Sequence, residues 1–333
     1  MGMKSFSPVM AARALWQMRL RKRPFVLSHG ITSSCNLRCS FCSYWRQPGP
    51  EMSTPEILRM LDEAADYGIG VYNAWTAEPL MREDLPLILR HARSRGLVTS
   101  LVTNGLLLEK RLEDLRDLDM LSVSLDGLKS YQELRGIDPA PVLQGIREAR
   151  NAGHEILINC VISGKNIAEL EDLVHLAESL GCWISFEPMH PFPDISQQVW
   201  QSLAVRDIPQ FEAAIERLMD LKRSGSPLIN SLTYLQMIKE SQKQNSKEAG
   251  RQFTCHAPEI IMHVAADGSV GACRVHQEPL GNVRSGLAKM WENTREKRKE
   301  LAAECSGCFF FGYVENSLLY DFVPEVMRHY QWM

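Results

Sequence analysis

Three cysteines near the amino-terminal end have the spacing of a cluster-binding loop. Cys35, Cys39 and Cys42 form the pattern Cx3Cx2C and directly follow a β-rich run, Phe25–Thr32. Three thiolates on one short loop can bind three irons of a [4Fe–4S] cubane and leave the fourth iron open to an exogenous ligand. A structural zinc ion would need a fourth protein ligand, and none lies nearby at the usual spacing. The pattern therefore favours a cluster with one open iron.

The cysteine content and the overall composition limit the classes of protein that fit. The chain has 333 residues, nine of them cysteine, and its 37 basic and 40 acidic side chains give a net charge of −3. An odd number of cysteines without a secretory signal indicates a reducing compartment, so we expect a cytoplasmic protein with metal or redox chemistry. The near-neutral charge argues against a nucleic-acid partner bound by phosphate neutralisation. No apolar run approaches the roughly 18–20 residues of a membrane span.

Six β-rich runs alternate with amphipathic helical stretches that would position the cysteine loop. Helix signals separate the runs, such as Ser53 before Thr54-Pro55-Glu56 and Gly68 at the end of that stretch. Strand–helix units of roughly 30 residues predict an α/β fold with a parallel sheet, open or curled into a partial barrel. In such folds the chemistry lies at the carboxyl ends of the strands. The runs are Phe25–Thr32, Gly70–Trp75, Leu97–Thr103, Met120–Leu125, Glu155–Ile162 and Trp183–Pro188.

The pattern changes after Met189. Helices are expected at 207–223 and 232–243, followed by a polar stretch, 241–252, that reads as a linker. The runs 259–264 and 269–274 flank a turn with Asp267-Gly268 and predict a hairpin, and a helix at 286–303 leads into Cys305. These limits divide the chain into a basic amphipathic helix (1–24), a barrel core (25–190), a helical connection (191–250) and a small α+β module that carries cysteines (251–333).

The first cysteine loop resembles that of the radical S-adenosylmethionine (SAM) superfamily, in which an aromatic residue such as Phe41 precedes the last cysteine. The resemblance covers about residues 25–190 and implies a partial (β/α)6 TIM-type barrel. It also implies that Cys35, Cys39 and Cys42 are the catalytic residues, holding a [4Fe–4S] cluster whose open iron chelates SAM. Reduced cluster would cleave SAM to methionine and a 5′-deoxyadenosyl radical, which abstracts a hydrogen atom from the substrate.

Two further motifs of that family follow at the expected strand ends. The sequence Thr76-Ala77-Glu78-Pro79 stands where the family usually has GGEP, so Glu78 and Pro79 are kept and both glycines are replaced. The resemblance implies that this loop holds the SAM amino group through backbone carbonyls and Glu78. The sequence Thr103-Asn104-Gly105 resembles the family's TNG turn, which makes Asn104 a candidate for SAM binding.

Residues near the fourth strand are additional candidates for SAM binding. Ser124 or Asp126 would contact the SAM ribose or carboxylate, and Arg135 is a candidate partner of the carboxylate. A structural salt bridge is an equally open interpretation of Arg135. Other pocket candidates are His29, Asn159, Glu187, His190, Arg274 and His276.

A second set of cysteines lies in the carboxyl-terminal module. Cys255 and Cys273 belong to a Cx12Gx4C pattern, and Cys305 and Cys308 form Cx2C. This arrangement resembles the twitch domain, the shortened form of the SPASM domain, and no cysteine follows Cys308. It implies one auxiliary [4Fe–4S] cluster held by these four cysteines, and therefore two clusters per chain. Tetrahedral zinc is the open alternative. The remaining cysteines, Cys160 and Cys182, lie in apolar runs and are interpreted as buried structural thiols.

The expected activity is that of a radical SAM enzyme that oxidises or rearranges a small molecule or a lipid in a biosynthetic pathway. One alternative is an enzyme that modifies a ribosomal peptide, and the non-enzyme alternative is an iron–sulfur electron carrier. The resemblance also implies a flavodoxin- or ferredoxin-type electron donor. No nucleic-acid partner is expected.

The amino-terminal stretch Val9–Arg23 has a helical pattern of apolar residues with a basic end. One interpretation is a helix packed on the domain. The other is an interfacial helix that rests on anionic lipid and gives the protein a peripheral membrane contact.

Overall fold

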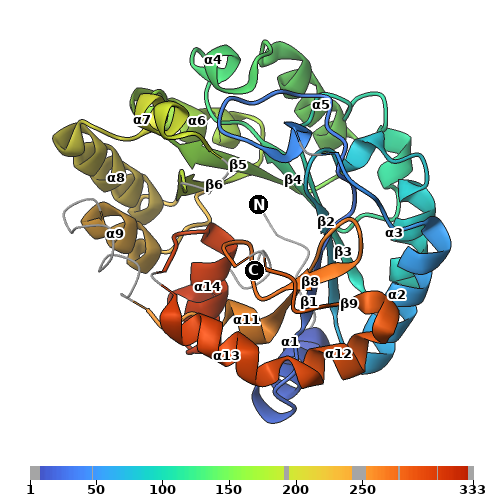
Figure 1. Cartoon of the computed structure of the whole chain (residues 1–333). Helices are drawn as coiled ribbons and strands as arrows, with labels where there is room; N and C mark the ends of the chain where they lie inside the picture. The colour runs from blue at the N-terminus through green and yellow to red at the C-terminus, as the bar shows by residue number, and fades with distance from the viewer. Residues whose placement is uncertain are drawn as a thin grey trace.

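Six parallel strands form the inner layer of the protein, in a computed structural model that describes residues 8–46, 48–190, 195–241, 253–276, 278–305 and 307–328. Each strand pairs with the next, and the sheet curves around the centre of the molecule with its helices outside (Figure 1). The predicted α/β partial barrel is confirmed, and its sheet is not closed. The strands are β1 (Val26–Gly30), β2 (Val71–Trp75), β3 (Val98–Thr103), β4 (Met120–Ser124), β5 (Ile156–Ile162) and β6 (Trp183–Pro188).

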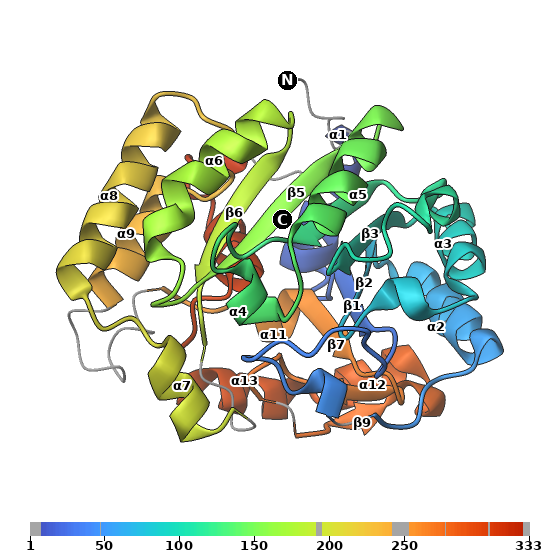
Figure 2. The same ribbon diagram turned by 90° about the horizontal axis from the view of Figure 1, so that it is seen from above.

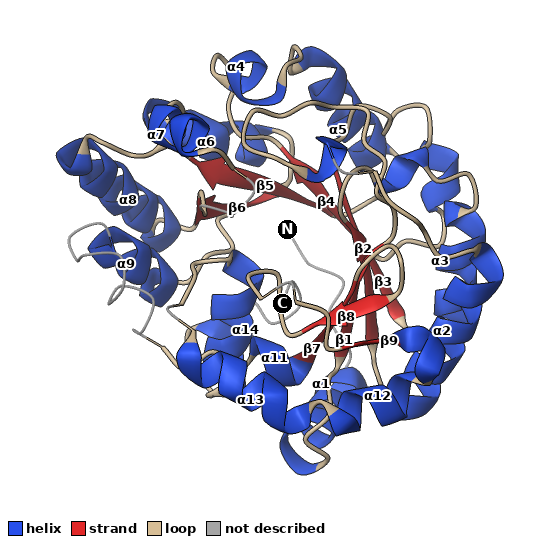
Figure 3. Ribbon diagram, viewed as in Figure 1, coloured by secondary structure: helices blue, strands red, loops and turns tan. Residues whose placement is uncertain are grey.

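Helices form the outer layer, which Figure 3 shows in blue around the red strands. Local sequence explains their limits. At the start of α2, the Ser53 N–H donates to Glu56 Oε2 (2.8 Å), and the helix ends at Gly68, whose φ of 104° is accessible to glycine without strain. The helices of the barrel and the connection are α2 (Thr54–Tyr67), α3 (Leu85–Ser94), α4 (Tyr131–Arg135), α5 (Ala140–Asn151), α6 (Leu170–Ser179), α7 (Gln197–Leu203), α8 (Ile208–Arg223) and α9 (Leu232–Ser241). Short turns are η2 (Tyr44–Arg46), η3 (Pro79–Met81), η4 (Leu112–Leu115), η5 (Ile167–Glu169), η6 (Val283–Ser285) and η7 (Val326–Arg328). The predicted linker lies, from residue 242 onward, outside the described residues.

The carboxyl-terminal hairpin continues the barrel sheet. Strand β7 (Ile261–Val264) pairs in parallel with β1, with Val26 opposite Ile261, and β8 (Ser269–Gly271) and β9 (Gly281–Asn282) follow in antiparallel order. The result is one nine-stranded sheet. From the sequence, we expected the hairpin to belong to a separate carboxyl-terminal module. Its backbone hydrogen bonds instead join it directly to the barrel sheet.

The helices after the hairpin differ from the single helix predicted at 286–303. The chain forms α12 (Leu287–Asn293) and α13 (Arg295–Glu304), which are separated at Thr294. Thr294 Oγ1 donates to the carbonyl of Met290 and Arg298 Nη1 donates to that of Trp291 (2.6 Å), so side chains replace the helical partners of these carbonyls. A short helix, α11 (Ala257–Ile260), precedes the hairpin.

The last helix, α14 (Phe311–Tyr320), was not predicted and covers the opening between the two ends of the barrel sheet (Figure 1). Its first N–H, from Phe311, donates to Glu187 Oε2 at the end of β6 (2.9 Å). On the other side, the His256 N–H beside α11 donates to Ser317 Oγ (2.9 Å). The helix therefore connects the last barrel strand to the carboxyl-terminal hairpin region.

The amino-terminal segment packs through its polar side. It consists of α1 (Pro8–Leu15) and a π-helical turn, η1 (Trp16–Leu20). Gln17 is 3% exposed and donates to the carbonyl of Tyr67 (3.0 Å), while Val9, Trp16 and Leu20 are 77%, 55% and 67% exposed. Figure 2 places α1 at the opposite end of the barrel from β9 and α12. Within the described ranges, no helix is both long and apolar enough to cross a membrane.

Candidate active site

A cavity of about 340 Å³ opens among the carboxyl-terminal halves of the strands. Alternating positions along each strand point inward, so every barrel strand contributes a side chain to the wall. Strand β7 adds His263 from the carboxyl-terminal hairpin. The strand residues of the wall are Ser28, Asn73, Trp75, Val102, Thr103, Ser124, Asn159, Val161, Ser185, Glu187 and His263.

The first cysteine loop lies between β1 and α2, and Cys35, Cys39 and Cys42 all line this cavity together with Phe41. Burial raises the pKa of the Cys39 thiol to about 11, and the Arg135 cation opposes that rise. The Leu37 N–H donates to Cys35 Sγ (3.4 Å), a contact that favours the thiolate. In the part of the chain that the structure describes, no three Cys, His, Asp or Glu side chains are placed to hold a single metal ion. Three thiols that line one cavity can hold three irons of a [4Fe–4S] cluster and leave the fourth iron open.

The loop after β2 keeps a glycine-like backbone although its glycines are replaced. Thr76 and Ala77 have φ angles of 69° and 45°, in the left-handed region that glycine adopts without strain. Both residues line the cavity. The loop path that the family motif implies is thus compatible with the substituted sequence.

Glu78 lies behind the cavity wall and does not line it. Its carboxylate is fully buried and accepts hydrogen bonds from Thr103 Oγ1 (2.7 Å), the Asn104 N–H (2.7 Å) and the Leu80 N–H (3.0 Å). Burial raises the pKa of this carboxyl, and the three donors oppose the rise. Pro79 is also buried and begins η3. Glu78 therefore joins the loop after β2 to the turn after β3 through its side chain.

Asn104 reaches from that turn toward the first cysteine loop. Its Nδ2 donates to Asn36 Oδ1 (2.8 Å) and lies 3.9 Å from Cys35 Sγ. Asn104 lines the cavity, as does Ser124 at the end of β4. These two candidates share the cavity with the three thiols.

Arg135 both forms a salt bridge and lines the cavity, so the two interpretations of this residue are compatible. Its Nε donates to Asp126 Oδ2 (2.5 Å), and Asp126 Oδ1 accepts from the Val161 N–H (2.8 Å). Asp126 is fully buried and does not line the cavity. Arg135 Nη1 lies 4.0 Å from Cys39 Sγ, and its guanidinium carbon is 5.4 Å from the centre of the Phe41 ring. Asp126 thus holds the guanidinium against the cysteine loop.

In the second group, Cys273 and Cys308 belong to a small apolar cluster beside β7 and α14, and Cys255 packs against it. Cys305 lies close enough for its charge to act on Cys308. The charges of the four thiols act on one another, and burial raises the pKa of Cys255 to about 11. Backbone N–H groups of His276 and Gly307 donate to Cys273 Sγ and Cys305 Sγ (both 3.3 Å). Hydrogen bonds to sulfur are part of how proteins hold and tune iron–sulfur clusters, so this group also fits a cluster. The other two cysteines, Cys160 and Cys182, are buried, as expected.

Aromatic side chains other than Phe41 complete the cavity, and they were not among the site residues expected from the sequence. Trp75 and Tyr313 line it together with Tyr44, Phe310 and Phe311. Trp75 ends β2, Tyr44 follows Cys42 closely, and Phe310 and Phe311 follow Cys308, whereas Tyr313 lies within α14. His263 was not predicted as a site residue, although it lies in the predicted hairpin strand 259–264.

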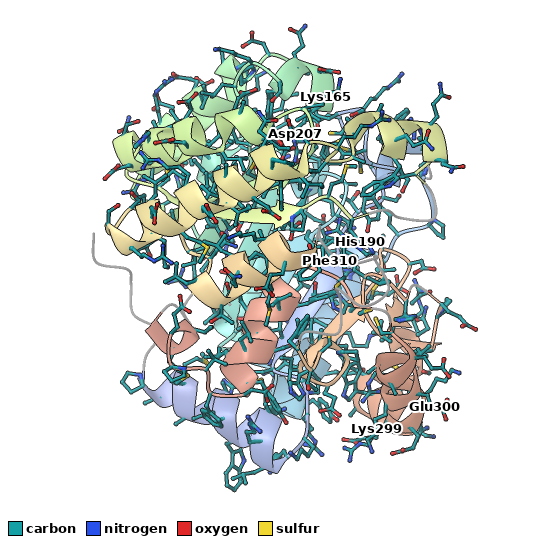
Figure 4. All side chains as sticks on the ribbon, turned by 90° about the vertical axis from the view of Figure 1, so that its left-hand side faces the viewer. Lys165, His190, Asp207, Lys299, Glu300 and Phe310 are labelled. Atoms are coloured by element: carbon teal, nitrogen blue, oxygen red, sulfur yellow. The ribbon has the colours of Figure 1, made fainter. Side chains whose placement is uncertain are left out.

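The remaining pocket candidates divide into two groups. Asn159, Glu187 and Arg274 line the cavity. His29 and His276 do not, and His29 Nδ1 instead lies 3.0 Å from Tyr72 Oη. His190 follows β6 and packs against Phe310, with the ring centres 5.2 Å apart (Figure 4).

Comparison with known proteins identifies the family. Residues 30–177 match the model of the radical SAM superfamily, and residues 255–309 match that of the iron–sulfur cluster-binding SPASM domain. The AdoMet-dependent heme synthase of Methanosarcina barkeri is 29% identical over 309 residues, which cover 86% of this chain and 88% of that protein. A probable GTP 3′,8-cyclase of Methanococcus aeolicus is 34% identical over 269 residues, which cover 77% and 87%.

Solved structures show the same fold. SuiB of Streptococcus suis bound to S-adenosylmethionine has a TM-score of 0.66 at 18% identity, covering 87% of this chain and 72% of SuiB. The structure of anSMEcpe with bound AdoMet has a TM-score of 0.65 at 16% identity, covering 91% of this chain and 98% of that one. The chain therefore belongs to the radical SAM superfamily: it is an enzyme that uses a [4Fe–4S] cluster and SAM, and it carries a SPASM iron–sulfur cluster-binding domain toward its carboxyl-terminal end.

Proposed function

We propose that this enzyme activates SAM in the 340 Å³ cavity and abstracts a hydrogen atom from a substrate bound there. The observation that carries the proposal is the shared cavity wall, in which Cys35, Cys39 and Cys42 meet residues from every barrel strand. When bound, the cluster and SAM supply a 5′-deoxyadenosyl radical. The chain holds the cluster through the three thiolates and shields the reacting groups from water with the aromatic wall.

Three side chains around the first cysteine loop are proposed to orient the cofactors. Arg135 presents a cation beside Cys39, which favours the thiolate and suits the carboxylate of SAM. The side-chain amide of Asn104 donates toward Cys35 Sγ. Ser124, at the end of β4, offers a hydroxyl to the same cavity. Glu78 has a positioning role in this proposal, because its carboxylate is already occupied by three donors.

The second cysteine group is proposed to hold one auxiliary [4Fe–4S] cluster through Cys255, Cys273, Cys305 and Cys308. Such a cluster supplies one-electron transfer, which favours a net oxidation or rearrangement over a redox-neutral reaction. The backbone donors to Cys273 and Cys305 would stabilise the thiolate ligands of such a cluster. We propose that residues 25–190 bind the first cluster and SAM, and that residues 251–333 bind the auxiliary cluster.

A small molecule is the favoured substrate class. Two relatives that match this chain along most of its length are named as an AdoMet-dependent heme synthase and a probable GTP 3′,8-cyclase, and neither name refers to a peptide. A ribosomal peptide is the alternative. SuiB has been crystallised with its precursor peptide SuiA, and a PqqA peptide cyclase of Granulibacter bethesdensis is 28% identical over 168 residues, 47% of this chain and 45% of that protein.

The test is SAM cleavage by the anaerobically reconstituted, dithionite-reduced enzyme, measured as 5′-deoxyadenosine. The native protein should form it, and the combined Cys35→Ala, Cys39→Ala and Cys42→Ala variant should not. Cys182→Ala is the matched control, since this buried thiol lies outside both cysteine groups. Formation of 5′-deoxyadenosine by the triple variant would refute the assignment of the first loop.

We further propose a peripheral membrane contact through the amino-terminal segment. Its exposed side carries Val9, Trp16 and Leu20, followed by exposed Arg21 and Lys22, which is the composition of an interfacial helix on anionic lipid. Vesicles of phosphatidylcholine with phosphatidylglycerol should bind the protein, and salt should weaken the binding. The paired change Trp16→Ser and Leu20→Ser should abolish it, whereas Leu87→Ser, at an exposed leucine of α3, should not. Equal binding by both variants contradicts this contact.

A flavodoxin- or ferredoxin-type protein is the proposed electron donor.

A further inference from the structure

A second cavity, of about 210 Å³, lies between the end of the amino-terminal segment and helices α11 and α13. Among the described residues, four cationic side chains and one carboxylate line this basic pocket: Lys22, Arg295, Arg298, Lys299 and Glu259. None of these five residues lines the cavity of the first cysteine loop. The excess of positive charge in a small space makes the basic pocket a candidate site for an anion.

Arg298 is the buried member of the basic pocket and is only 3% exposed. Its Nε donates to the carbonyl of Pro258 (2.9 Å), its Nη1 donates to that of Trp291 (2.6 Å), and its guanidinium carbon lies 3.5 Å from the centre of the Trp291 ring. Within the described ranges, Nη2 has no hydrogen-bond partner, and it is not one of the polar atoms that the protein encloses completely. These contacts fix the guanidinium and leave Nη2 to donate to a ligand.

Lys22 reaches the basic pocket from a turn with an unfavourable backbone conformation. Its φ is 53°, in the left-handed region that costs a residue with a Cβ free energy relative to glycine. The next N–H, from Arg23, donates to the carbonyl of Gln17 (3.1 Å), and this bond holds the turn. Local strain of this kind is retained where the surrounding structure requires the conformation, and here the turn places the exposed Lys22 beside α13.

The other two cations of the basic pocket are only weakly neutralised. Arg295 pairs with Glu292 (2.8 Å) and Lys299 with Glu296 (2.9 Å), and exposed pairs three residues apart on a helix contribute little stability. Burial lowers the pKa of Arg298 to about 10, and the Arg295 cation adds to this decrease. The like charges therefore act on one another, and a bound anion would offset their repulsion.

We propose that the basic pocket binds a phosphate group, supplied by a lipid headgroup or by a soluble phosphate compound. The phosphate oxygens would accept charge-assisted hydrogen bonds from Arg298 Nη2 and from the ammonium groups of Lys22 and Lys299. A phosphate offers more acceptor oxygens and more negative charge than a carboxylate, which suits several separate cations. The inference goes beyond the proposed function, because the activation of SAM involves none of these residues.

The test is calorimetric titration of the cluster-loaded enzyme with inorganic phosphate at low ionic strength. The native protein should bind one phosphate per chain, at least about tenfold more tightly than acetate. The double variant Lys22→Gln, Lys299→Gln should bind phosphate at least about tenfold more weakly, because two charge-assisted donors are lost. The matched control is Arg21→Gln, Lys297→Gln, which removes two neighbouring exposed cations that do not line the pocket. It should lower the affinity by less than about threefold, since exposed charges outside the pocket are screened.

Glu259→Gln tests the basic pocket with a change of opposite sign. It removes the only carboxylate among the described lining residues, so phosphate should bind at least about threefold more tightly. A variant that merely disturbs the fold would not strengthen the binding. Arg298→Gln should abolish the binding, but it also removes the bonds to Pro258 and Trp291, so the variants of the exposed lysines decide the test.

Vesicles of phosphatidylcholine with phosphatidic acid distinguish the two sources of the phosphate. For a lipid headgroup, Lys22→Gln, Lys299→Gln should lose at least about five times more vesicle affinity than Arg21→Gln, Lys297→Gln, although both lose two charges. Inorganic phosphate should then compete with the vesicles. For a soluble phosphate compound, the two double variants should bind vesicles alike and differ only in their affinity for inorganic phosphate.

Three outcomes would overturn the phosphate site. One is the absence of saturable phosphate binding by the native enzyme. A second is an equal loss of phosphate affinity in the two double variants, which would indicate general attraction to a basic surface. A third is unchanged or weaker phosphate binding by Glu259→Gln. Failure of the proposed function is distinguishable, since it would abolish 5′-deoxyadenosine formation by the native enzyme whether or not phosphate binds.

Discussion

At the residue scale, the loop after β2 preserves a backbone conformation without the residue type that favours it. Thr76 and Ala77 occupy the left-handed region, which costs a residue with a Cβ about 1–2 kcal/mol relative to glycine. Such local strain is retained where the surrounding structure and function require the conformation. The backbone of this loop, more than its side chains, is therefore the feature that the cavity uses.

Ala77→Gly should relieve this strain. We expect the variant to be unchanged or up to about 1 kcal/mol more stable, because relief of the left-handed conformation offsets the greater freedom of glycine in the unfolded chain. The control is Ala213→Gly at an exposed position within α8, which should lose about 1 kcal/mol. Thermal unfolding of the two variants measures the difference, and an equal loss in both would show that Ala77 carries no strain.

Glu78→Gln tests whether this residue acts through the fold of the site. In the native protein, Thr103 and Leu80 donate to Oε1 and Asn104 to Oε2, so an amide must turn its NH2 toward a donor. The variant should lose about 1–3 kcal/mol of stability and bind SAM more weakly, with both clusters still assembled. Thermal unfolding, SAM titration and iron analysis give the three readouts. Weaker SAM binding with unchanged stability would instead favour a direct contact between Glu78 and SAM.

At the element scale, α14 carries a buried carboxyl into the opening of the barrel. Glu315 is 2% exposed and accepts from the Ser231 N–H (2.7 Å). Burial raises its pKa from about 4.5 to about 7, opposed by this hydrogen bond and by Lys222. Between these pH values the unfolded chain releases the proton while the folded protein retains it, so stability falls as the pH rises from about 4.5 to 7.

Glu315→Gln should remove this dependence, because the amide oxygen still accepts from Ser231 and carries no charge. The variant should become more stable than the native protein as the pH rises, by about 1–3 kcal/mol at pH 7 and above. Anaerobic thermal unfolding from pH 5 to pH 8 measures the difference. Glu300→Gln, at an exposed carboxylate of α13 (Figure 4), should follow the native curve. A difference between Glu315→Gln and the native protein that does not change with pH would contradict the raised pKa.

The barrel elements could be predicted because each repeats the same local signals. The six strands and α2 agree with their predicted limits to within about two residues. Helix α14 was missed because its stretch, with a mixed apolar and polar sequence, is fixed by tertiary partners such as Glu187 and not by periodicity. The pairing of β7 with β1 was missed for a similar reason, since strand order between distant segments depends on packing that sequence pattern does not reveal.

The same contrast between local sequence signals and tertiary packing applies to the site residues. Spacing along the chain was sufficient to group the cysteines, and the structure brings the first three to one cavity. Whether a side chain faces that cavity or the space behind it depends on the path of the loop. Thus Asn104 and Arg135 line the wall, whereas Glu78 and Asp126 support it from behind.

At the scale of the whole molecule, the two cysteine groups should load separately. We expect about eight irons per chain in the reconstituted native protein and about four in the Cys305→Ala, Cys308→Ala variant. That variant should still cleave SAM, at least in part, but should fail to complete product formation if the auxiliary cluster transfers electrons. Iron, sulfide and zinc analysis with 5′-deoxyadenosine assays test this. Four irons with one zinc in the native protein would make the carboxyl-terminal site structural, and a normal product yield without the auxiliary cluster would exclude an electron-transfer role.

The parallel pairing of β1 with β7 also limits how the protein can be divided. A chain cut after residue 250 would contain every barrel strand, yet the outer side of β1 would lose the neighbour that now satisfies its N–H and C=O groups between Val26 and His29. An unpaired strand edge is a template for pairing with other chains. The isolated barrel should therefore tend to self-associate through β1, and the cysteine loop that follows this strand would be the first part of the site to lose its geometry.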